Sequence, residues 1–356
     1  MNCPTIRFGL IGAGVASETH ARELRRVAGA SLEAVFAREQ TKAAAFGAAF
    51  SVPRRYSDVS LLVADPDIDA VIITTPNGHH LDYAVAAAKA GKHVIVEKPL
   101  EINEERASRI IAACRDAGVR LFIIYQRRYS AAAQQALSDI RNGRLGRIIL
   151  VNIVDNQYRS HTYYQKDAWR GTKSVEGGGC VITQSTHLID LAQYLVGPIR
   201  SVFGRTVTAY HAIETEDVAA AVFEFEGGAI GTFSSSTAAF PGQRHLLTIS
   251  GTEGSIIING EHDEIVFRQT KSEGTASIIP DSFSFADPIE PRDYPTDGQR
   301  KQLQAIVGTL LDPDAPAFAD IDALIAVRVI DAIYRSASEG RPVEVHHSQA
   351  AGRQPK

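Results

Sequence analysis

The sequence predicts an N-terminal α/β domain with a doubly wound parallel sheet and a C-terminal α+β domain with a large open, mostly antiparallel sheet. The length of 356 residues supports two domains, because a single domain usually has roughly 150 residues. In the first third, short apolar runs alternate with helical stretches, whereas after residue 148 strand-like runs follow one another directly. We expect the domains to cover residues 1–122 and 123–346, followed by a polar tail at 347–356.

The N-terminal domain is expected to alternate strands with helices. Apolar runs predict strands at 6–11, 32–37, 70–74, 93–96 and 121–124. Between them, helices are expected at 17–27, 41–50, 81–90 and 103–117. This order builds βαβ units, and their right-handed crossovers place helices on both faces of a parallel sheet.

The C-terminal domain is expected to be rich in strands. After a helix at 130–142, strands are expected at 148–154, 202–209, 218–225, 229–234, 246–250, 255–258 and 265–268. Successive strands without helices between them favour an antiparallel or mixed sheet. Further helices are expected at 184–195 and 321–338, a surface loop at 269–294 and a frayed tail from 346.

Charge and cysteine content exclude several classes of protein. Lys plus Arg number 37 and Asp plus Glu 41, so the formal charge is −4, which argues against nucleic acid or an anionic membrane as the partner. The three cysteines are widely spaced, which argues against a disulfide scaffold or a cysteine zinc site and is typical of a reducing cytoplasm. Neither a signal peptide nor an apolar run of membrane-spanning length is found, so we expect a cytoplasmic protein.

A glycine-rich turn lies between the first expected strand and the first expected helix. Its sequence is Gly12-Ala13-Gly14-Val15-Ala16-Ser17. Gly12 makes the tight turn, and Gly14 allows the backbone to approach a pyrophosphate at the positive end of the helix. We expect Gly12, Gly14, Val15 and Ala16 to bind a dinucleotide; the alternative is a purely structural turn.

The end of the second strand bears on the choice between NAD and NADP. Ala37 stands where an acid would bind the ribose 2′-hydroxyl, and Arg38 follows it. Because an arginine there accommodates a 2′-phosphate, the sequence favours NADP slightly. Alternatively, Arg38 stacks on the adenine or faces solvent.

Two further clusters leave the third and fourth apolar strands. One contains Thr75-Pro76-Asn77 and His80, and the other is Glu97-Lys98-Pro99. Open α/β sheets bind ligands at the carboxyl ends of parallel strands. We therefore expect the cofactor to contact Thr75, Pro76, Asn77, His80, Glu97, Lys98 and also Gln126. Lys98 is also suited to bind a substrate hydroxyl and stabilise the alkoxide that forms as hydride leaves; the alternative is a solvated surface lysine.

Taken together, these motifs make the sequence similar to the Gfo/Idh/MocA family of glucose–fructose and inositol dehydrogenase-like oxidoreductases, over almost the whole chain. The similarity rests on Gly12-x-Gly14, Thr75-Pro76-Asn77, Glu97-Lys98-Pro99, Gln126-Arg127-Arg128-Tyr129, Gly143-Arg144-Leu145-Gly146-Arg147-Ile148, Trp169-Arg170-Gly171 and the stretch from Gly177-Gly178-Gly179 to His187-Leu188-Ile189-Asp190.

The resemblance implies an N-terminal Rossmann domain and a C-terminal domain whose large sheet mediates a homodimer or homotetramer, with the substrate cleft between the domains. It assigns Lys98 to the substrate hydroxyl and the nicotinamide ribose. It also makes His187 the acid/base that exchanges the hydroxyl proton while hydride moves. An imidazole suits this task, because its ordinary pKa of about 6.5 allows proton exchange at neutral pH.

One position departs from the family pattern. Many members place an aspartate four residues before the histidine, on the same helical face, whereas this sequence has Thr183 there. A threonine can hydrogen-bond a substrate but carries no charge to raise an imidazole pKa. Either Asp190 or water is then left to orient His187.

The remaining expected substrate contacts are Arg127, Trp169 and Arg170. An aromatic face stacks on the C–H surface of a sugar, and an arginine binds hydroxyls or a carboxylate. The alternative is a core tryptophan with a surface arginine. Gln126 and Arg127 lie at the expected domain junction and face either the cofactor or the substrate.

These residues favour an NAD(P)-dependent oxidoreductase that acts on a secondary alcohol or ketone of a sugar, a sugar derivative or a cyclitol. The alternatives are a glycosidase-type or self-recycling member of the same fold that keeps its NAD bound, and a non-catalytic regulator that binds a dinucleotide. No H-E-x-x-H or paired-histidine motif is present, so no metal is expected. The G-x-S-x-G motif of a serine hydrolase is also missing.

Overall fold

A computed structural model describes residues 4–243, 245–274, 294–312, 314 and 320–347, which form two compact units. Unit 1 comprises the described residues of 1–130, 174–177 and 289–318, and unit 2 comprises those of 131–173, 178–288 and 319–356. The division expected from the sequence assumed continuous domains, whereas both units are assembled from separate segments.

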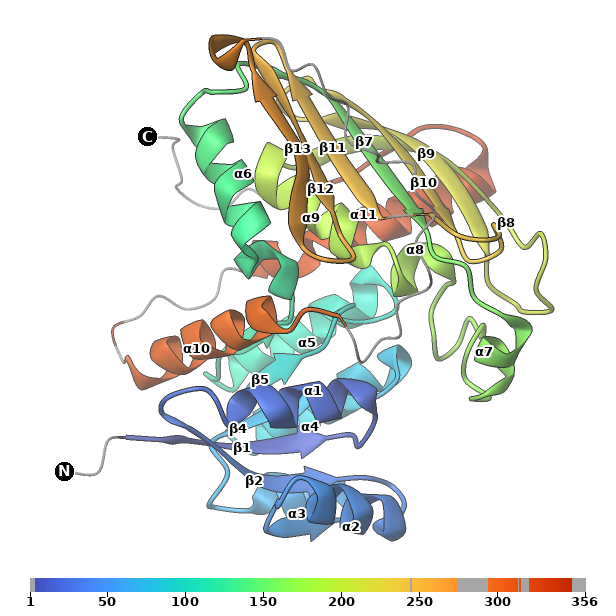
Figure 1. Ribbon diagram of the computed structural model, residues 1–356. Helices are drawn as coiled ribbons and strands as arrows, with labels where there is room; N and C mark the ends of the chain where they lie inside the picture. The colour runs from blue at the N-terminus through green and yellow to red at the C-terminus, as the bar shows by residue number, and fades with distance from the viewer. Residues whose placement is uncertain (1–3, 244, 275–293, 313, 315–319, 348–356) are drawn as a thin grey trace. The chain divides into compact units, whose positions relative to one another are not determined.

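A six-stranded parallel sheet forms the centre of unit 1 (Figure 1). In spatial order its strands are β3 (Arg54–Tyr56), β2 (Ala30–Phe36), β1 (Ile6–Ile11), β4 (Ala70–Ile73), β5 (His93–Val96) and β6 (Leu121–Ile123). From β1 the chain builds outward first on one side and then on the other, which is the predicted doubly wound order. The sequence did not predict β3, because its three residues are polar or aromatic and form no apolar run.

Helices lie on both faces of this sheet. They are α1 (Val15–Leu24), α2 (Gln40–Ala49), α3 (Val59–Ala64), α4 (His80–Lys89), α5 (Glu104–Asp116) and α10 (Asp297–Leu311). Alternate residues of β1 point to opposite faces, as the pleat requires. Phe8 and Leu10 pack in the core with Leu24 of α1, while the position of Gly9 faces Leu62 of α3.

Helix α10 belongs to unit 1 although it begins about 170 residues after the end of β6. Leu303 and Val307 complete the core over β1. Gln302 Nε2 donates a hydrogen bond of 2.7 Å to the Ile123 carbonyl at the end of β6. The sequence analysis did not predict this helix.

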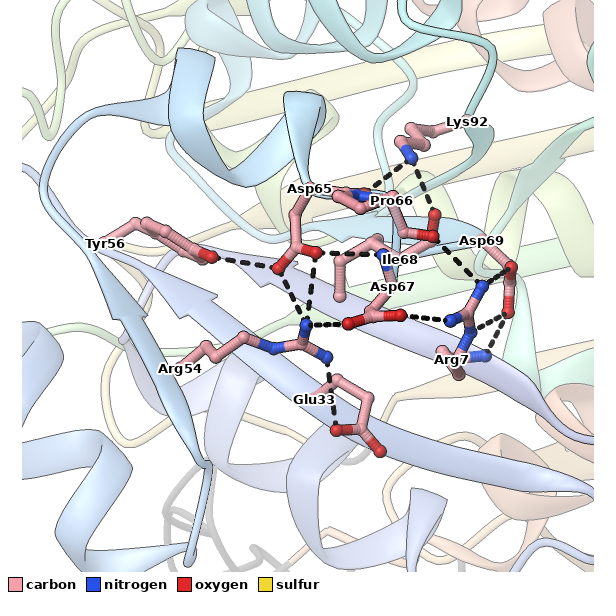
Figure 2. A network of polar contacts seen from close by, with 10 residues as sticks. All are labelled: Arg7, Glu33, Arg54, Tyr56, Asp65, Pro66, Asp67, Ile68, Asp69 and Lys92. Atoms are coloured by element: carbon pink, nitrogen blue, oxygen red, sulfur yellow. Dashed lines mark hydrogen bonds and ion pairs between the residues drawn. The ribbon is translucent and has the colours of Figure 1, made fainter.

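A polar network joins the amino ends of the parallel strands (Figure 2). Arg7, at the start of β1, pairs with Asp69 just before β4 and with Asp67, at 2.8 Å in each case. Arg54, at the start of β3, pairs with Asp65 at 3.1 Å and with Asp67 at 2.9 Å. These contacts tie the amino edge of the sheet together, and the expected ligand-binding residues follow the opposite, carboxyl ends.

The sheet of unit 2 has eight strands and is mixed but mostly antiparallel, as predicted. In spatial order they are β13 (Glu264–Thr270), β12 (Gly254–Asn259), β11 (Leu246–Gly251), β7 (Ile148–Asn156), β10 (Ile230–Ser236), β9 (Val218–Phe225), β8 (Ile199–Val207) and β14 (Val343–Glu344). Only the pair β7 and β10 is parallel among these described strands. One face is covered by α6 (Ala131–Arg141), α8 (Cys180–Thr183), α9 (Thr186–Val196) and α11 (Asp320–Glu339).

The opposite face of this sheet carries exposed apolar side chains. Phe203 on β8 pairs with Val222 on β9, and Val222 pairs with Thr232 on β10. Phe203 is 42% exposed, Val222 46% and the nearby Ile230 54%. Exposed and buried residues alternate along β9, so Val222 points away from the core.

The remaining elements are short. Helix α7 covers His161–Gln165, and the 3₁₀ turns are η1 (Asn77–His79), η2 (Gln126–Tyr129) and η3 (Lys271–Glu273). The loop expected at 269–294 begins with the end of β13 and η3, and its part at 275–293 lies outside the described residues, as does the tail at 348–356. Within the described residues, no helix has the length and hydropathy needed to cross a bilayer.

Candidate functional site

The glycine-rich turn of unit 1 has the geometry that its sequence predicts. Gly12 has a φ of +125°, and a Cβ atom there would lie 2.5 Å from Thr74 Oγ1, so only glycine fits. Gly14 precedes α1 and is exposed, and nothing lies within 4 Å of the position that its Cβ would occupy. The backbone at the start of α1 is therefore open to an approaching ligand, beside the first residues Val15 and Ala16.

Ser17 occupies the third small position of the motif. It is fully buried, and its Oγ lies 2.6 Å from Thr74 Oγ1, which in turn donates to the Ile11 carbonyl. The side chain thus joins α1 to the carboxyl end of β4.

The end of β2 places an aromatic surface and a cation together. Ala37 is buried and Arg38 is exposed. The rings of Phe36 and Tyr83 lie 5.6 Å apart. Burial raises the pKa of Tyr83, and the charge of Arg38 opposes this rise.

The turn after β4 contains three of the expected cofactor residues. Thr75 Oγ1 is buried and has no hydrogen-bond partner among the described residues. Asn77 Nδ2 donates to the Glu176 carbonyl at 2.8 Å, so its amide nitrogen holds the segment 174–177 of unit 1. Pro76, between them, precedes η1.

His80 lies inside unit 1 at the start of α4 and is 1% exposed. Its Nε2 is 2.9 Å from the Thr75 carbonyl oxygen, and its Nδ1 is 3.0 Å from that of Pro99. Both ring nitrogens are therefore engaged by the backbone. The ring joins the turn after β4 to the turn after β5.

Glu97 and Lys98 follow β5. Glu97 Oε1 lies 2.8 Å from Nε2 of the buried His20, and Glu97 Oε2 accepts a 3.1 Å bond from the Lys98 backbone N–H. Burial would raise the pKa of Glu97, but the hydrogen bond with His20 and the charges nearby outweigh it, so this pKa lies below its ordinary value. Lys98 is half-buried beside this carboxylate.

After β6, η2 presents Gln126 and Arg127. Gln126 Oε1 is buried without a hydrogen-bond partner in the described part of the chain, and Arg127 is 9% exposed. A Cβ atom at Gly298 of α10 would lie 2.5 Å from the Gln126 carbonyl oxygen. This close approach holds Gln126 at the carboxyl edge of the sheet.

In unit 2, Trp169 and Arg170 form a compact aromatic group with Tyr163 of α7. The Arg170 guanidinium carbon lies 4.2 Å from the centroid of the Tyr163 ring and 4.7 Å from that of Trp169. Arg170 Nε donates to Asp167 at 3.1 Å, and Nη1 donates to the Tyr163 hydroxyl. Much of the hydrogen-bonding capacity of Arg170 is thus used within the group, whereas Trp169 is half-buried.

His187 is the second residue of α9, and Thr183 is the last residue of α8; both are half-buried. A turn at Gln184 and Ser185 separates the two helices. Asp190, one turn after His187, is 1% exposed. The Ser185 hydroxyl donates to Ser235 Oγ at 2.8 Å, and this bond anchors the turn to β10.

The glycine run before α8 is required for packing. A Cβ atom at Gly179 would lie 1.7 Å from the Glu216 carbonyl oxygen, and one at Gly178 would lie 2.0 Å from the Tyr334 hydroxyl. The buried Glu216 carboxylate accepts hydrogen bonds from Gly179 N and Val181 N at 2.9 and 3.0 Å. Burial nevertheless raises the pKa of Glu216.

Sequence reasoning missed two residues that contact the candidate site. They are His20, which binds Glu97, and Gln299, which binds His20. The only sequence signal was the spacing of Ser17 and His20, which places both on one face of α1.

The chain matches two described families along its length. Residues 6–125 match the oxidoreductase family with an NAD-binding Rossmann fold, and residues 133–257 match the GFO/IDH/MocA C-terminal domain.

Individual proteins show the same similarity. Levoglucosan dehydrogenase of Pseudarthrobacter phenanthrenivorans is 31% identical over 242 residues, which cover 61% of this chain and 62% of that protein. Myo-inositol 2-dehydrogenase of Thermotoga maritima is 25% identical, and the match covers 96% of this chain and 98% of that protein. The solved structure of the WlbA dehydrogenase from Bordetella pertussis, in complex with NADH and UDP-GlcNAcA, is 30% identical, with a TM-score of 0.83 over 97% of this chain and 100% of that chain.

Proposed function

The chain belongs to the Gfo/Idh/MocA family of NAD-binding oxidoreductases, and from this premise we propose that it transfers hydride between a nicotinamide cofactor and a secondary alcohol or ketone of a sugar, a sugar derivative or a cyclitol. The observation that carries the proposal is the carboxyl edge of the parallel sheet. There an open glycine turn follows β1 and the half-buried Lys98 follows β5. Two buried polar atoms, which have no hydrogen-bond partner among the residues that the structure describes, follow β4 and β6.

The residues at this edge fit a dinucleotide. Backbone N–H groups of Gly14, Val15 and Ala16 at the start of α1 are placed to bind a pyrophosphate. Thr75 Oγ1 and Gln126 Oε1 are buried polar atoms that gain a partner when a ligand binds beside them. When bound, the cofactor supplies the hydride acceptor or donor.

For the cofactor, we propose a slight preference for NADP over NAD. No carboxylate stands at Ala37 to bind a ribose 2′-hydroxyl, and Arg38 is exposed at the end of β2, where it is able to pair with a 2′-phosphate.

Lys98 and His187 are proposed to handle the substrate hydroxyl. Lys98 donates a hydrogen bond to it and stabilises the negative charge that develops on oxygen in the transition state. His187 takes the hydroxyl proton during oxidation and returns it during reduction. Thr183 offers a neutral hydroxyl, so in this chain no carboxylate at that position supports the imidazole.

Further substrate contacts are proposed for Arg127, Trp169 and Arg170. The half-buried Trp169 ring offers a stacking surface for the C–H face of a sugar. Because Arg170 already binds Asp167 and Tyr163, it orients this aromatic group and leaves its remaining N–H groups for the substrate.

A second copy of the chain is proposed as the protein partner. The open face of the eight-stranded sheet carries Phe203, Val222 and Ile230, all more than a third exposed. Packing this face against its equivalent in another copy removes the apolar surface from water, as expected for a dimer or tetramer.

Formation or loss of reduced cofactor tests the proposed reaction. We expect turnover with at least one member of a panel that contains levoglucosan, myo-inositol, aldoses and UDP-linked sugars, offered with NAD⁺ and NADP⁺. On that substrate, Lys98→Met and His187→Ala should each lower kcat by about 10²–10⁴-fold. The exposed residues Lys89 and His262 provide matched controls, and their replacement should leave kcat unchanged. Full turnover by both site variants would show that these residue roles are wrong.

A further inference from the structure

A buried histidine connects the first helix of unit 1 to the proposed reactive lysine. His20 lies on α1 with its side chain 0% exposed, and its Nε2 is 2.8 Å from Glu97 Oε1. Glu97 immediately precedes Lys98 at the end of β5. Neither the sequence motifs nor the proposed function assigns a task to His20.

The position of His20 on α1 makes this contact part of a pair. Ser17 and His20 are three residues apart and therefore share one face of the helix. Ser17 contacts Thr74 at the end of β4, and His20 contacts Glu97 at the end of β5. The helix that presents its N-terminus to the cofactor is thus joined by side chains to two neighbouring strand ends.

Gln299 of α10 also contacts the His20 ring. The amide nitrogen of Gln299 lies 3.1 Å from His20 Nδ1 and 3.0 Å from His20 Nε2. The His20 ring is thus within hydrogen-bond distance of both Gln299 and the Glu97 carboxylate.

The oriented carboxylate acts on Lys98 in two ways. Glu97 Oε2 accepts the Lys98 backbone N–H at 3.1 Å, which fixes the backbone of the lysine. Burial raises the pKa of Glu97, whereas the hydrogen bond with His20, the charge of His20 and then the charge of Lys98 lower it, so the charges of Glu97 and Lys98 interact. The same attraction favours the ammonium form of Lys98.

Glu23, an acid near His20 on α1, is engaged elsewhere. Glu23 accepts a hydrogen bond of 2.9 Å from Thr296 and pairs with Arg26 at 3.2 Å. Among the described residues, Glu97 supplies the carboxylate that hydrogen-bonds with His20. A purely structural contact needs no such arrangement, because an apolar side chain fills a buried space without the desolvation cost of an imidazole and a carboxylate.

We propose that His20 is a positioning residue of the reaction: it holds the Glu97 carboxylate in place, with Gln299 orienting the ring, and through Glu97 it sets the orientation and charge of Lys98. This inference rests on the proposed function, in which Lys98 binds the substrate hydroxyl. It adds that His20 of α1 and Gln299 of α10 act on Lys98 through the Glu97 carboxylate.

The titration of Lys98 provides a test that needs no substrate. Lysines of the whole chain are dimethylated with ¹³C-formaldehyde and a borane reductant, and each signal is followed by NMR as a function of pH. Lys98→Arg identifies the Lys98 signal by its loss. The variants are His20→Leu, His20→Gln, which keeps a donor near the Nε2 position, Glu97→Gln and the double variant with both His20→Leu and Glu97→Gln.

We expect the Lys98 titration midpoint to move to lower pH in Glu97→Gln, because the ammonium loses its fixed anion. It should move in the same direction in His20→Leu and stay close to the wild-type midpoint in His20→Gln. In the double variant the midpoint should equal that of Glu97→Gln, because His20 acts through the carboxylate. If a charged His20 ring instead acted directly on Lys98, its loss in His20→Leu would move the Lys98 midpoint to higher pH.

An unchanged Lys98 midpoint in folded His20→Leu overturns the inference, and so does a further shift in the double variant. If His20→Leu does not fold, as judged by thermal denaturation, Gln299→Leu carries the test, since it releases the ring and should also lower the midpoint. Turnover by Lys98→Met separates the two proposals. Full turnover by Lys98→Met refutes the role of Lys98 in the reaction but not the effect of His20 on Lys98 through Glu97. Unchanged Lys98 titration midpoints refute only that effect.

Discussion

Replacing Gly14 by alanine separates ligand binding from folding at the glycine-rich turn. Gly14 has a φ of −98° and a ψ of −169°, which any residue adopts, and nothing lies within 4 Å of the added Cβ. The free energy of unfolding should therefore change by less than about 0.5 kcal/mol. The new methyl group instead stands where a pyrophosphate approaches the backbone. Losing one charge-assisted hydrogen bond, worth about 1.5–3 kcal/mol, weakens cofactor binding roughly tenfold to a hundredfold.

Gly12→Ala is the matched control, because it makes the same chemical change two residues earlier. There the Cβ would lie 2.5 Å from Thr74 Oγ1 and 3.2 Å from the Thr74 carbonyl group, at a φ of +125°. Backbone strain of about 1–3 kcal/mol adds to the cost of displacing Thr74 from its hydrogen bond with Ser17, about 1 kcal/mol. We expect the free energy of unfolding to fall by about 2–4 kcal/mol in total.

Two measurements on the same samples check this contrast. Urea denaturation reports the free energy of unfolding, and quenching or enhancement of nicotinamide fluorescence reports the dissociation constants of NADH and NADPH. The reasoning fails if Gly14→Ala binds both cofactors as tightly as the wild type. It also fails if the two variants lose the same stability, because the structure places only one of them against other atoms.

Three other perturbations test other parts of the molecule. Arg38→Ala should weaken NADPH binding about tenfold more than NADH binding in titration calorimetry, and equal losses would contradict a role in 2′-phosphate recognition. Val222→Lys places a charge on the open sheet face and should shift the sedimentation coefficient towards that of a monomer; an unchanged oligomer would place the interface elsewhere. At the amino edge, burial would raise the pKa of Asp69, but its hydrogen bonds and ion pair with Arg7 outweigh this and lower it (Figure 2). A lowered carboxyl pKa contributes stability above the unfolded value of about 3.9 that is lost as pH falls through the folded value. Urea denaturation from pH 7 to 3 should show this loss, and Asp69→Asn should flatten it; an equally steep loss in the variant would assign the effect to other carboxylates.

The glycine-rich turn and Lys98, which belong to the part of the candidate site in unit 1, could be predicted from the sequence. Gly12 and Gly14 follow an apolar run and precede a helical one, and this local order alone predicts a tight turn at a helix N-terminus. Lys98 was predictable for a similar reason, because it follows the strand-length run 93–96 and the ends of parallel strands meet at one edge. Both inferences depend on patterns within a few residues.

The parts that the sequence did not predict depend on contacts between distant segments. His20 and Glu97 are 77 residues apart, and Gln299 is 279 residues from His20. Helix α10 also escaped prediction, although it fills the core over β1 and holds the end of β6. In unit 2, the break between α8 and α9 follows from the anchoring of Ser185 to Ser235, 50 residues away.

The sequence by itself therefore determined the two kinds of sheet, the glycine turn, the lysine at a strand end and the family to which the chain is similar. Only the tertiary structure decided that His80 is engaged by two backbone turns, that the glycines before α8 are needed because Glu216 and Tyr334 pack against them, and that His20 holds Glu97. The physical reason is that periodicity and turn chemistry are set by neighbouring residues along the chain. The partner of a buried polar group, in contrast, is chosen by which distant segments pack together when the core closes, and no local pattern records that choice.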